Sequence, residues 1–381
     1  MKLASKLICA SICVCLAACG GGGSGTLPAS SGAPPVPNSG PAVPGGSDAV
    51  SGPRITEHRV SDTLIGGLTI GTDGSLYATT PTAIDVFSAS SLQSIGMLTI
   101  AAQAGGVHPD TWPAVGHLVP TGAINGSTNG TVSALAQASG SATPQPGQAV
   151  IDSVALRPAL VIYTIATGLF DIAYGTPNDT YHDLTEGPSG YTWVAADRPT
   201  AHGLSGFLVT TKPGCSQTFF TGAIGSITEG SDGDIWVGTD PSLNGATPSE
   251  LLRVNPASGA IVGTFKLPPG SRIAGLANGP DGALWFTDSG LNEIGRITTG
   301  GQVTYYPVPL ANSGLAAITA DSDGALWFTQ TLSNTVGRIT TAGVVTEFAV
   351  PTPNAGLGEI VACPCGTLYF TEQHAIGKIT P

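Results

Sequence analysis

Short runs in which apolar and polar residues alternate fill the chain from residue 54 onward, and Gly, Asp, Asn and Pro separate one run from the next. Alternation with a period of two places every second side chain on one face of an extended strand, whereas an amphipathic helix needs a period near 3.6. The pattern therefore predicts an all-β protein made of many short strands joined by tight turns.

Two stretches of the sequence are copies of one unit. GPDGALWFTDSGLNEIGRITTGGQVTYYPVP occupies residues 279–309, and DSDGALWFTQTLSNTVGRITTAGVVTEFAVP occupies residues 321–351, 42 positions later. Each unit predicts four strands: one such as LAAIT, then, after an Asp-Gly turn, ALWFT, VGRIT and VTEFAV. Four strands repeated with a period of this length are typical of the blades of a β-propeller.

The glycine that precedes the second strand marks further, weaker copies of the unit. Together the copies place this marker glycine at seven positions: Gly74, Gly130, Gly190, Gly233, Gly282, Gly324 and Gly366. The longest intervals lie early in the chain, where the copies carry insertions. We therefore expect residues 51–381 to form a seven-bladed β-propeller of four-stranded blades, because stacked blades cover one another's faces.

The last copy and the start of this domain complement each other. The last copy ends with AIGKITP and lacks a counterpart of VTEFAV, whereas RITEHRV, which begins at Arg54, resembles the missing strand. We expect Ile55 to Val60 to complete the last blade and so to close the ring, since an unpaired sheet edge is prone to pair with other chains.

Two columns of residues recur at fixed places in the unit. Large aromatic residues lie three positions after the marker glycine, at Tyr77, Trp193, Trp236, Trp285, Trp327 and Tyr369. A column with this period predicts packing between blades rather than a ligand cage. An aspartate directly before the marker glycine recurs at Asp73, Asp232, Asp281 and Asp323, which is typical of turns, because Asp accepts a local hydrogen bond and Gly permits a positive φ.

Composition narrows the class of function. The chain has 54 Gly and 30 Pro in 381 residues, charged residues make up 10% of it, and its formal net charge is −12. An acidic chain without a basic patch is not expected to bind nucleic acid. No P-loop, Gly-x-Ser-x-Gly or His-Glu-x-x-His motif indicates a nucleotide, serine-hydrolase or zinc-protease site.

The first 50 residues predict an export signal followed by a tether. Residues 1–19 combine two lysines with the apolar run LICASICVCLAA and end at Cys19, before four glycines. This segment resembles a bacterial lipoprotein signal peptide, which implies a lipid on Cys19 that anchors the protein in the cell envelope, with the domain in the periplasm or at the cell surface. Gly20 favours the outer membrane; an ordinary cleavage site near Cys19 is the alternative. Residues 20–50, rich in Gly, Ser, Ala and Pro, predict a disordered tether.

Cys363 and Cys365 are separated only by Pro364. In an exported protein such a pair is either a tight disulfide or two free thiols, and the sequence leaves both alternatives open. A zinc site is disfavoured, because no other Cys or His lies at zinc-binding spacing.

The repeat GPDGALWFT, followed by IGRIT, Gly and VTEF, is similar to that of the virginiamycin B (streptogramin B) lyases and their relatives, most strongly over residues 279–381. The resemblance implies a seven-bladed propeller and a carbon–oxygen lyase that opens a cyclic depsipeptide by elimination. In that reaction a histidine removes the proton α to the ester carbonyl, and Mg²⁺ stabilises the developing charge. The family has this histidine eight residues before a marker glycine and a metal-binding glutamate six residues after one.

At the positions that correspond to the two family histidines, this chain has Ala316 and Gly358, and the neighbouring acidic position holds Gly356. Neither a methyl group nor a hydrogen atom accepts a proton, so the family base is missing. Glu372 matches the metal-binding glutamate, and Asp288 occupies the same place in the fifth blade. The resemblance thus implies Glu372 and Asp288 as the candidate Mg²⁺ contacts.

Other titratable residues are candidates for the missing base or for ligand contacts. His182 lies eight residues before the marker glycine of the third copy, which makes it the candidate catalytic base; a polar rim residue bonded to a neighbouring loop is the alternative. An insert at residues 101–120 is a candidate lid, and a Pro-rich loop with incidental histidines is the alternative there. Its candidate ligand-binding residues are His108, Asp110, Trp112 and His117.

The sequence favours a lipid-anchored envelope propeller that binds a small molecule, a peptide or a protein loop at its channel mouth and lacks the family's elimination chemistry. The alternative is a Mg²⁺-dependent carbon–oxygen lyase acting on cyclic depsipeptides of the streptogramin B type, with its base moved to His182 or to the insert. Apart from Mg²⁺ in that case, the sequence indicates no cofactor.

Overall fold

A computed structural model describes residues 52–61, 63–64, 67–80, 83–98, 117–126, 131–139, 157–164, 169–174, 179–201, 203–211, 218–219, 223–239 and 249–380. For the strands between residues 117 and 174, and for residues 218–219, only the backbone is described. The chain divides into two units, Met1–Val50 and Ser51–Pro381. The predicted signal peptide with Cys19 and the predicted tether lie outside the described residues.

The described part of Ser51–Pro381 forms seven antiparallel sheets of four strands each, and the all-β prediction is confirmed. The first three sheets consist of β2 (Leu68–Ile70), β3 (Ser75–Thr79), β4 (Ile84–Ser88) and β5 (Ser94–Leu98); β6 (His117–Gly126), β7 (Thr131–Ser139), β8 (Arg157–Thr164) and β9 (Leu169–Tyr174); and β10 (Thr180–Glu186), β11 (Thr192–Thr200), β12 (Gly203–Thr210) and β13 (Thr218–Phe219). A 3-10 turn, η1 (Pro188–Gly190), joins β10 to β11.

The remaining sheets follow the same strand order. They consist of β14 (Ile224–Glu229), β15 (Ile235–Thr239), β16 (Glu250–Val254) and β17 (Ile261–Lys266); β18 (Ile273–Asn278), β19 (Leu284–Asp288), β20 (Glu293–Ile297) and β21 (Val303–Pro307); β22 (Leu315–Ala320), β23 (Ala325–Gln330), β24 (Thr335–Thr340) and β25 (Val345–Ala349); and β26 (Ile360–Ala362), β27 (Leu368–Thr371), β28 (Ala375–Thr380) and β1 (Arg54–Arg59). In the part of the chain that is described, no helix has the length and apolar character needed to cross a membrane.

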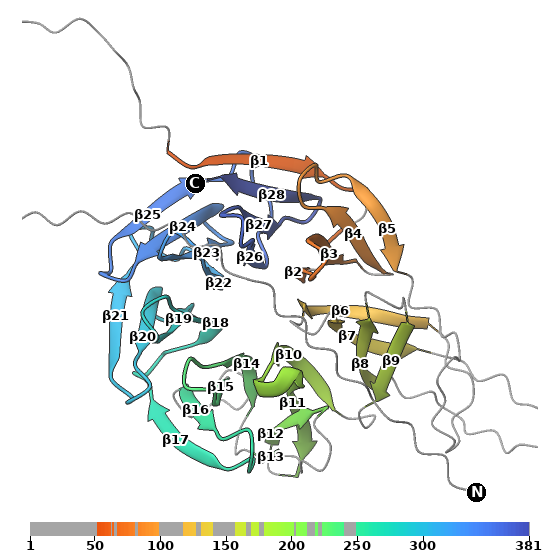
Figure 1. Ribbon diagram of the computed structural model, residues 1–381. Helices are drawn as coiled ribbons and strands as arrows, with labels where there is room; N and C mark the ends of the chain where they lie inside the picture. The colour runs from red at the N-terminus through yellow and green to blue at the C-terminus, as the bar shows by residue number, and fades with distance from the viewer. Residues whose placement is uncertain are drawn as a thin grey trace, which may run out of the picture. The chain divides into compact units, whose positions relative to one another are not determined.

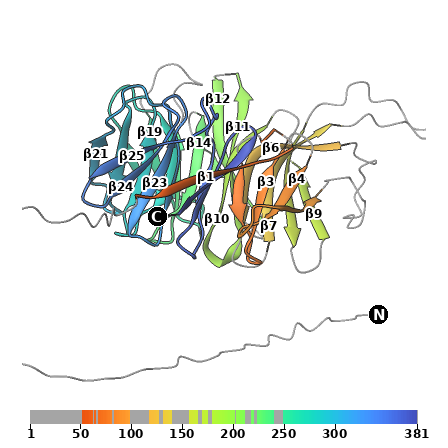
Figure 2. The same ribbon diagram turned by 90° about the horizontal axis from the view of Figure 1, so that it is seen from above.

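Within residues 51–381 the sheets stand around a common centre, and the first strand of each lies nearest to it (Figure 1). These first strands contact one another in the order β2, β6, β10, β14, β18, β22 and β26, and β26 also contacts β2. At right angles to this view, the sheets are seen standing side by side (Figure 2). The centre of the described domain is therefore lined by first strands.

The seventh sheet combines the two ends of the domain. Strand β1 pairs with β28 in antiparallel register, with Ile55 opposite Ile379 and Glu57 opposite Gly377. This is the pairing that the sequence predicts for the N-terminal strand. On the other side of the sheet, Tyr369 of β27 shares a hydrophobic cluster with Leu76 of β3 in the first sheet.

The aromatic residue of the second strand packs against the second strand of the next sheet. Trp285 lies in one cluster with Phe328, and Trp327 in one cluster with Phe370. Every residue of this aromatic column is at most 3% exposed. The column consists of Tyr77, Trp193, Trp236, Trp285, Trp327 and Tyr369. The predicted packing between sheets is confirmed, and burial of these large rings is a major source of stability.

The Asp-Gly turns before the second strands have the predicted chemistry. Gly282 adopts φ 74°, which glycine tolerates, and Asp281 accepts hydrogen bonds from Trp285 Nε1 at 3.0 Å and Arg296 Nε at 2.6 Å. Burial alone would raise the pKa of Asp281, but these hydrogen bonds hold it below its usual value. Corresponding ion pairs join Arg253 to Asp232 and Arg338 to Asp323.

One buried carboxylate breaks the repeat where β1 joins the seventh sheet. In the sixth sheet, Gln330 Nε2 donates a hydrogen bond to Glu347 Oε1 at 3.0 Å. The seventh sheet has a glutamate at both corresponding positions, Glu372 and Glu57. Glu372 is 2% exposed, and its Oε1 lacks a hydrogen-bond partner among the described residues. Burial and the negative charge of Glu57, opposed by Arg59, raise the pKa of Glu372 to about 7.

Replacement of Gly337 in β24 tests the packing of third strands on second strands. A Cβ atom at Gly337 would overlap the ring of Phe328, so we expect Gly337→Ala to lower the free energy of unfolding by about 1–3 kcal/mol. At Gly96 in β5 no atom lies within 4 Å of such a Cβ, so Gly96→Ala is the matched control and should change little. Urea denaturation measures both, and equal midpoints would contradict the packing.

Replacement of Glu372 tests the pair of carboxylates at the seam. The pKa of the Glu372 carboxyl group is about 7 in the folded protein, whereas a glutamate in an unfolded chain has a pKa near 4.3. Between these two pH values the folded state binds more protons than the unfolded state, so the free energy of unfolding falls as pH rises. We expect Glu372→Gln to remove this fall and to be more stable than the parent at pH 8. Urea midpoints across this pH range measure the effect.

The sixth sheet supplies the reverse experiment. Gln330→Glu places a second carboxylate beside Glu347, so this variant should lose stability as pH rises. Parallel pH profiles for the parent and both variants would show that the two carboxylates do not interact.

Candidate functional site

A cavity of about 740 Å³ lies where the first strands meet. Its described walls come from β2, β10, β14, β18, β22 and β26 and the residues directly before them. The positions eight residues before the marker glycines line it with small residues: Gly225, Ala274, Ala316 and Gly358. Because these residues have little or no side chain, the backbone forms much of the wall. We call this space the central cavity.

Irregular pairing at the start of the first strands shapes this wall. Strands β10, β14, β18 and β22 each shift register against their second strands near the small-residue positions. In β10 the shift falls between Tyr181 and Asp183, so His182 is the extra residue. Such a bulge redirects side chains and is common beside binding sites. Both His182 and Asp183 line the central cavity.

A buried carboxylate orients His182. Its Nε2 atom lies 2.8 Å from Oδ2 of Asp197, which is 1% exposed. The other oxygen, Asp197 Oδ1, accepts the backbone N–H of Ile224 at 3.0 Å, so the neighbouring sheet holds the carboxylate in place. When Nε2 carries the proton shared with Asp197, Nδ1 is left as the basic nitrogen. The pair therefore has the arrangement of a carboxylate-oriented base.

Two acids occupy matching positions on opposite parts of the cavity wall. Asp183 follows His182, and Glu359 follows Gly358. Burial raises the pKa of Asp183 to about 6, although hydrogen bonds from the backbone N–H groups of Ile227 and Leu184 oppose the rise. Burial and the charge of Asp183 raise the pKa of Glu359 to about 8. Glu359 therefore keeps its proton to a higher pH than Asp183 does.

The sequence predicted only part of this arrangement. It predicted His182, Ala316 and Gly358 as residues facing the channel, and all three line the central cavity. It missed Asp183 and Glu359, which lie one position further along their first strands. The available signal was that only these two copies have an acid directly after the predicted channel-facing residue.

The proposed metal contacts lie elsewhere. Neither Glu372 nor Asp288 lines the central cavity: Glu372 lies at the seam with β1, and Asp288 is 0% exposed. The Asp288 carboxylate organises its own loop by accepting hydrogen bonds from Ser271 Oγ and from the backbone N–H groups of Arg272, Gly290 and Leu291. No group of three or more His, Cys, Asp or Glu side chains within the described ranges could hold a metal ion. These residues therefore do not fit the Mg²⁺ site that the family resemblance implies.

The candidate lid falls mostly outside the structure. His108, Asp110 and Trp112 lie outside the described residues, and His117 is the first residue of β6, where only the backbone course is described.

Known proteins are similar to this chain in sequence and in structure. The model of the virginiamycin B lyase family matches residues 217–381. A virginiamycin B lyase from Bordetella bronchiseptica is 43% identical over 51 residues, which are 13% of this chain and 17% of the relative. The chain thus matches less than a fifth of that relative's length.

Two solved structures are similar over most of the chain. A catalytically inactive histidine-to-alanine variant of virginiamycin B lyase from Staphylococcus aureus, with quinupristin, is 23% identical with a TM-score of 0.61, covering 87% of this chain and 100% of that one. A streptogramin B lyase structure is 22% identical with a TM-score of 0.60, covering 86% and 97%. These likenesses support the fold. The sequence match to the virginiamycin B lyase family lies within residues 217–381, which make up less than half of the chain.

Proposed function

We propose that the seven sheets are the blades of a closed β-propeller, completed by β1 in the last blade, and that the central cavity binds a small molecule without the elimination chemistry of the lyases. The sequence of contacts between first strands and the pairing of β1 with β28 support the closed ring. A cavity of about 740 Å³ is within the range of small-molecule sites.

One observation carries the binding function: Ala316 and Gly358 line the cavity at the positions where the family resemblance implies histidines. An enzyme of that kind needs a base within hydrogen-bond reach of the proton it removes. The cavity instead offers backbone groups and the carboxyl groups of Asp183 and Glu359, which suit a ligand with hydrogen-bonding or cationic groups. A peptide or a protein loop could present the same groups at the mouth.

A carbon–oxygen lyase acting on cyclic depsipeptides is the second candidate function. The observation that favours it is the contact of His182 with Asp197, which supplies an oriented base at the cavity wall. It requires this dyad to replace both family histidines, and the described residues offer no group that fits Mg²⁺.

We further propose that the protein is a lipoprotein of the bacterial cell envelope, anchored in the outer membrane through Cys19. The apolar run that ends at Cys19, followed by glycines, supports export and lipidation. The Gly-, Ser- and Pro-rich residues 20–50 would then separate the propeller from the membrane.

The binding function and the lyase function differ in their product. We expect the protein to bind quinupristin, measured by calorimetry, and to leave the ring intact in the presence of Mg²⁺, measured by mass spectrometry of the ligand. The physical reason is the lack of a proton acceptor at Ala316 and Gly358. Gly358→Trp, which fills the cavity, should abolish binding.

His182→Ala is the matched control for this experiment. It should leave the intact quinupristin unchanged, as the parent does. Ring opening by the parent that EDTA and His182→Ala both abolish would instead establish the lyase. If the Gly358→Trp variant still binds quinupristin, the ligand binds outside the central cavity and this part of the proposal is wrong.

Lipidation of Cys19 is tested in a bacterial host. Labelled palmitate should be incorporated into the full chain and should be lost in Cys19→Ala, because a thioether-linked lipid needs this thiol. Cys15→Ala, a control in the same apolar run, should keep the label. Label retained in Cys19→Ala would refute the anchor.

A further inference from the structure

The turn before the second strand of the seventh sheet contains a disulfide between Cys363 and Cys365, which decides between the two alternatives left open by the sequence. The turn itself closes through a hydrogen bond from Gly366 N to Cys363 O at 3.0 Å. Five other sheets make the same turn without a disulfide, and in the third sheet the bond runs from Gly190 N to Gly187 O at 3.1 Å. In the other four sheets it runs from Gly74 to Gly71, Gly233 to Gly230, Gly282 to Gly279 and Gly324 to Asp321, at 2.9 to 3.2 Å.

The fold therefore has no need of this disulfide. A cross-link stabilises a protein mainly by restricting its unfolded chain, and the gain shrinks with the length of the closed loop. Cys363 and Cys365 are only two positions apart, so the loop is close to the shortest possible. The role of the pair is better sought in its chemistry.

The two sulfur atoms have different surroundings. Cys365 and Pro364 are exposed, whereas Cys363 is half-buried and packs against the cluster shared by the first and seventh sheets. The backbone N–H of Cys365 donates to Cys363 Sγ at 3.2 Å. An incoming thiolate therefore has access to Cys365, and Cys363 has a donor ready to stabilise it as the departing thiolate.

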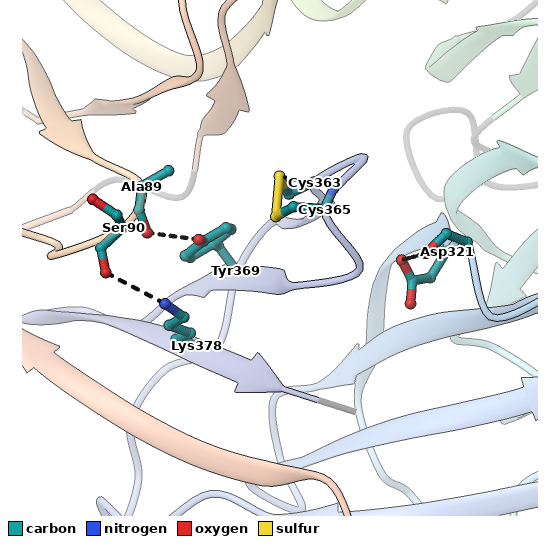
Figure 3. The surroundings of a disulfide bond; sticks show 8 residues. Ala89, Ser90, Asp321, Cys363, Cys365, Tyr369 and Lys378 are labelled. Atoms are coloured by element: carbon teal, nitrogen blue, oxygen red, sulfur yellow. Dashed lines mark hydrogen bonds between the residues drawn. A yellow bond between two sulfur atoms is a disulfide. The ribbon is translucent and has the colours of Figure 1, made fainter. Parts of the chain in front are cut away.

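Lys378, near the disulfide, has no aspartate partner in the turn of its own sheet, because Cys365 occupies that position. In the fifth and sixth sheets the third-strand arginine pairs with the turn aspartate, at 2.6 Å and 2.7 Å. The seventh sheet has Lys378 and Cys365 at these two positions. Lys378 Nζ lies 5.8 Å from the centre of the Tyr369 ring and 3.4 Å from Ser90 O (Figure 3).

These groups share one open site. Cys365, Tyr369 and Lys378 line a groove of about 470 Å³ whose other wall comes from the first sheet, including Ser88 and the exposed Ile95. Tyr369 Oη also donates to Ala89 O at 2.6 Å, which fixes the ring beside the disulfide (Figure 3). A polypeptide segment or a small molecule that enters the groove meets Cys365 and the positive charge of Lys378 on one wall, and Asp73 and Ser88 on the other.

We propose that Cys363–Cys365 is a thiol–disulfide exchange site that oxidises a partner bearing two thiols. The partner's first thiolate attacks Cys365 Sγ, the Cys363–Cys365 bond breaks, and its electron pair leaves on Cys363 Sγ. The partner's second thiolate then attacks the partner's first sulfur atom, which is bonded to Cys365 Sγ in the mixed disulfide. That bond breaks, and its electron pair leaves on Cys365 Sγ. Two electrons and two protons pass to Cys363 and Cys365, and the partner leaves as a disulfide. Lys378 occupies the position from which the arginines of the fifth and sixth sheets reach the residue that corresponds to Cys365, so it is a positioning residue for the Cys365 thiolate released in the second step.

The test measures how fast the oxidised full chain oxidises a dithiol. Dithiothreitol represents small dithiols, a short reduced peptide with a Cys-x-x-Cys pair represents polypeptides, and glutathione disulfide at equal concentration is the benchmark oxidant. Because the Cys365 N–H donates to the departing Cys363 Sγ, this sulfur should leave faster than glutathione does, and we expect the chain to exceed the benchmark about tenfold. Alkylation and mass spectrometry of the peptide that contains residues 363–365 separate this pair from the other cysteines.

Variants make the result specific. Cys363→Ser combined with Cys365→Ser should abolish the reaction and keep the parent's urea midpoint, since the turn forms without the disulfide elsewhere. Lys378→Met should slow the reaction roughly threefold, whereas Lys266→Met, an exposed lysine in β17, should not. A rate no higher than that of glutathione disulfide with either dithiol, or reduction that unfolds the domain, overturns the proposal. Equal rates for the two lysine variants would remove Lys378 from it. The dithiol that is oxidised faster shows whether the partner is a small molecule or a polypeptide.

Discussion

No sheet of this protein can bury its second strand without its neighbours. In the last three sheets the second strand presents a Trp or Tyr to one side and Leu and Phe to the other, and the clusters that bury these residues include residues of two sheets. A strand with apolar side chains on both faces is stable only when other apolar surfaces cover both faces and remove them from water. The position of every sheet, and with it the wall of the central cavity, therefore follows from packing between sheets rather than from any single sheet.

Repetition explains why so much of the fold could be predicted. The Trp column and the Asp-Gly turns recur at fixed intervals, so each copy supports the assignment of the others, and Trp285 and Asp281 have the surroundings that their columns predict. The carboxylate at Glu372 could not be assigned in this way, because its behaviour depends on Glu57 from the other end of the domain. The state of Cys363 and Cys365 was equally unpredictable, since their spacing allows both a disulfide and free thiols.

The candidate site was predictable in outline only. The register of the repeat predicts which residues face the channel, and His182, Ala316 and Gly358 do line it. The orientation of His182 by Asp197 depends on a contact between adjacent strands, and the interaction of Asp183 with Glu359 spans different sheets. Such contacts follow from how the first strands bulge and meet, which a pattern of residue types along the chain does not contain.

Strand β1 comes first in the described chain, yet it belongs to the last sheet. On a ribosome it emerges long before its partner β28, so one edge of the seventh sheet is completed only after the strands of the other six sheets have been synthesised. Contacts with such a large separation along the chain form slowly. In the meantime β1 has free backbone donors and acceptors that a strand of another nascent chain can take. The hazard created by this topology is therefore aggregation during synthesis rather than unfolding of the finished protein.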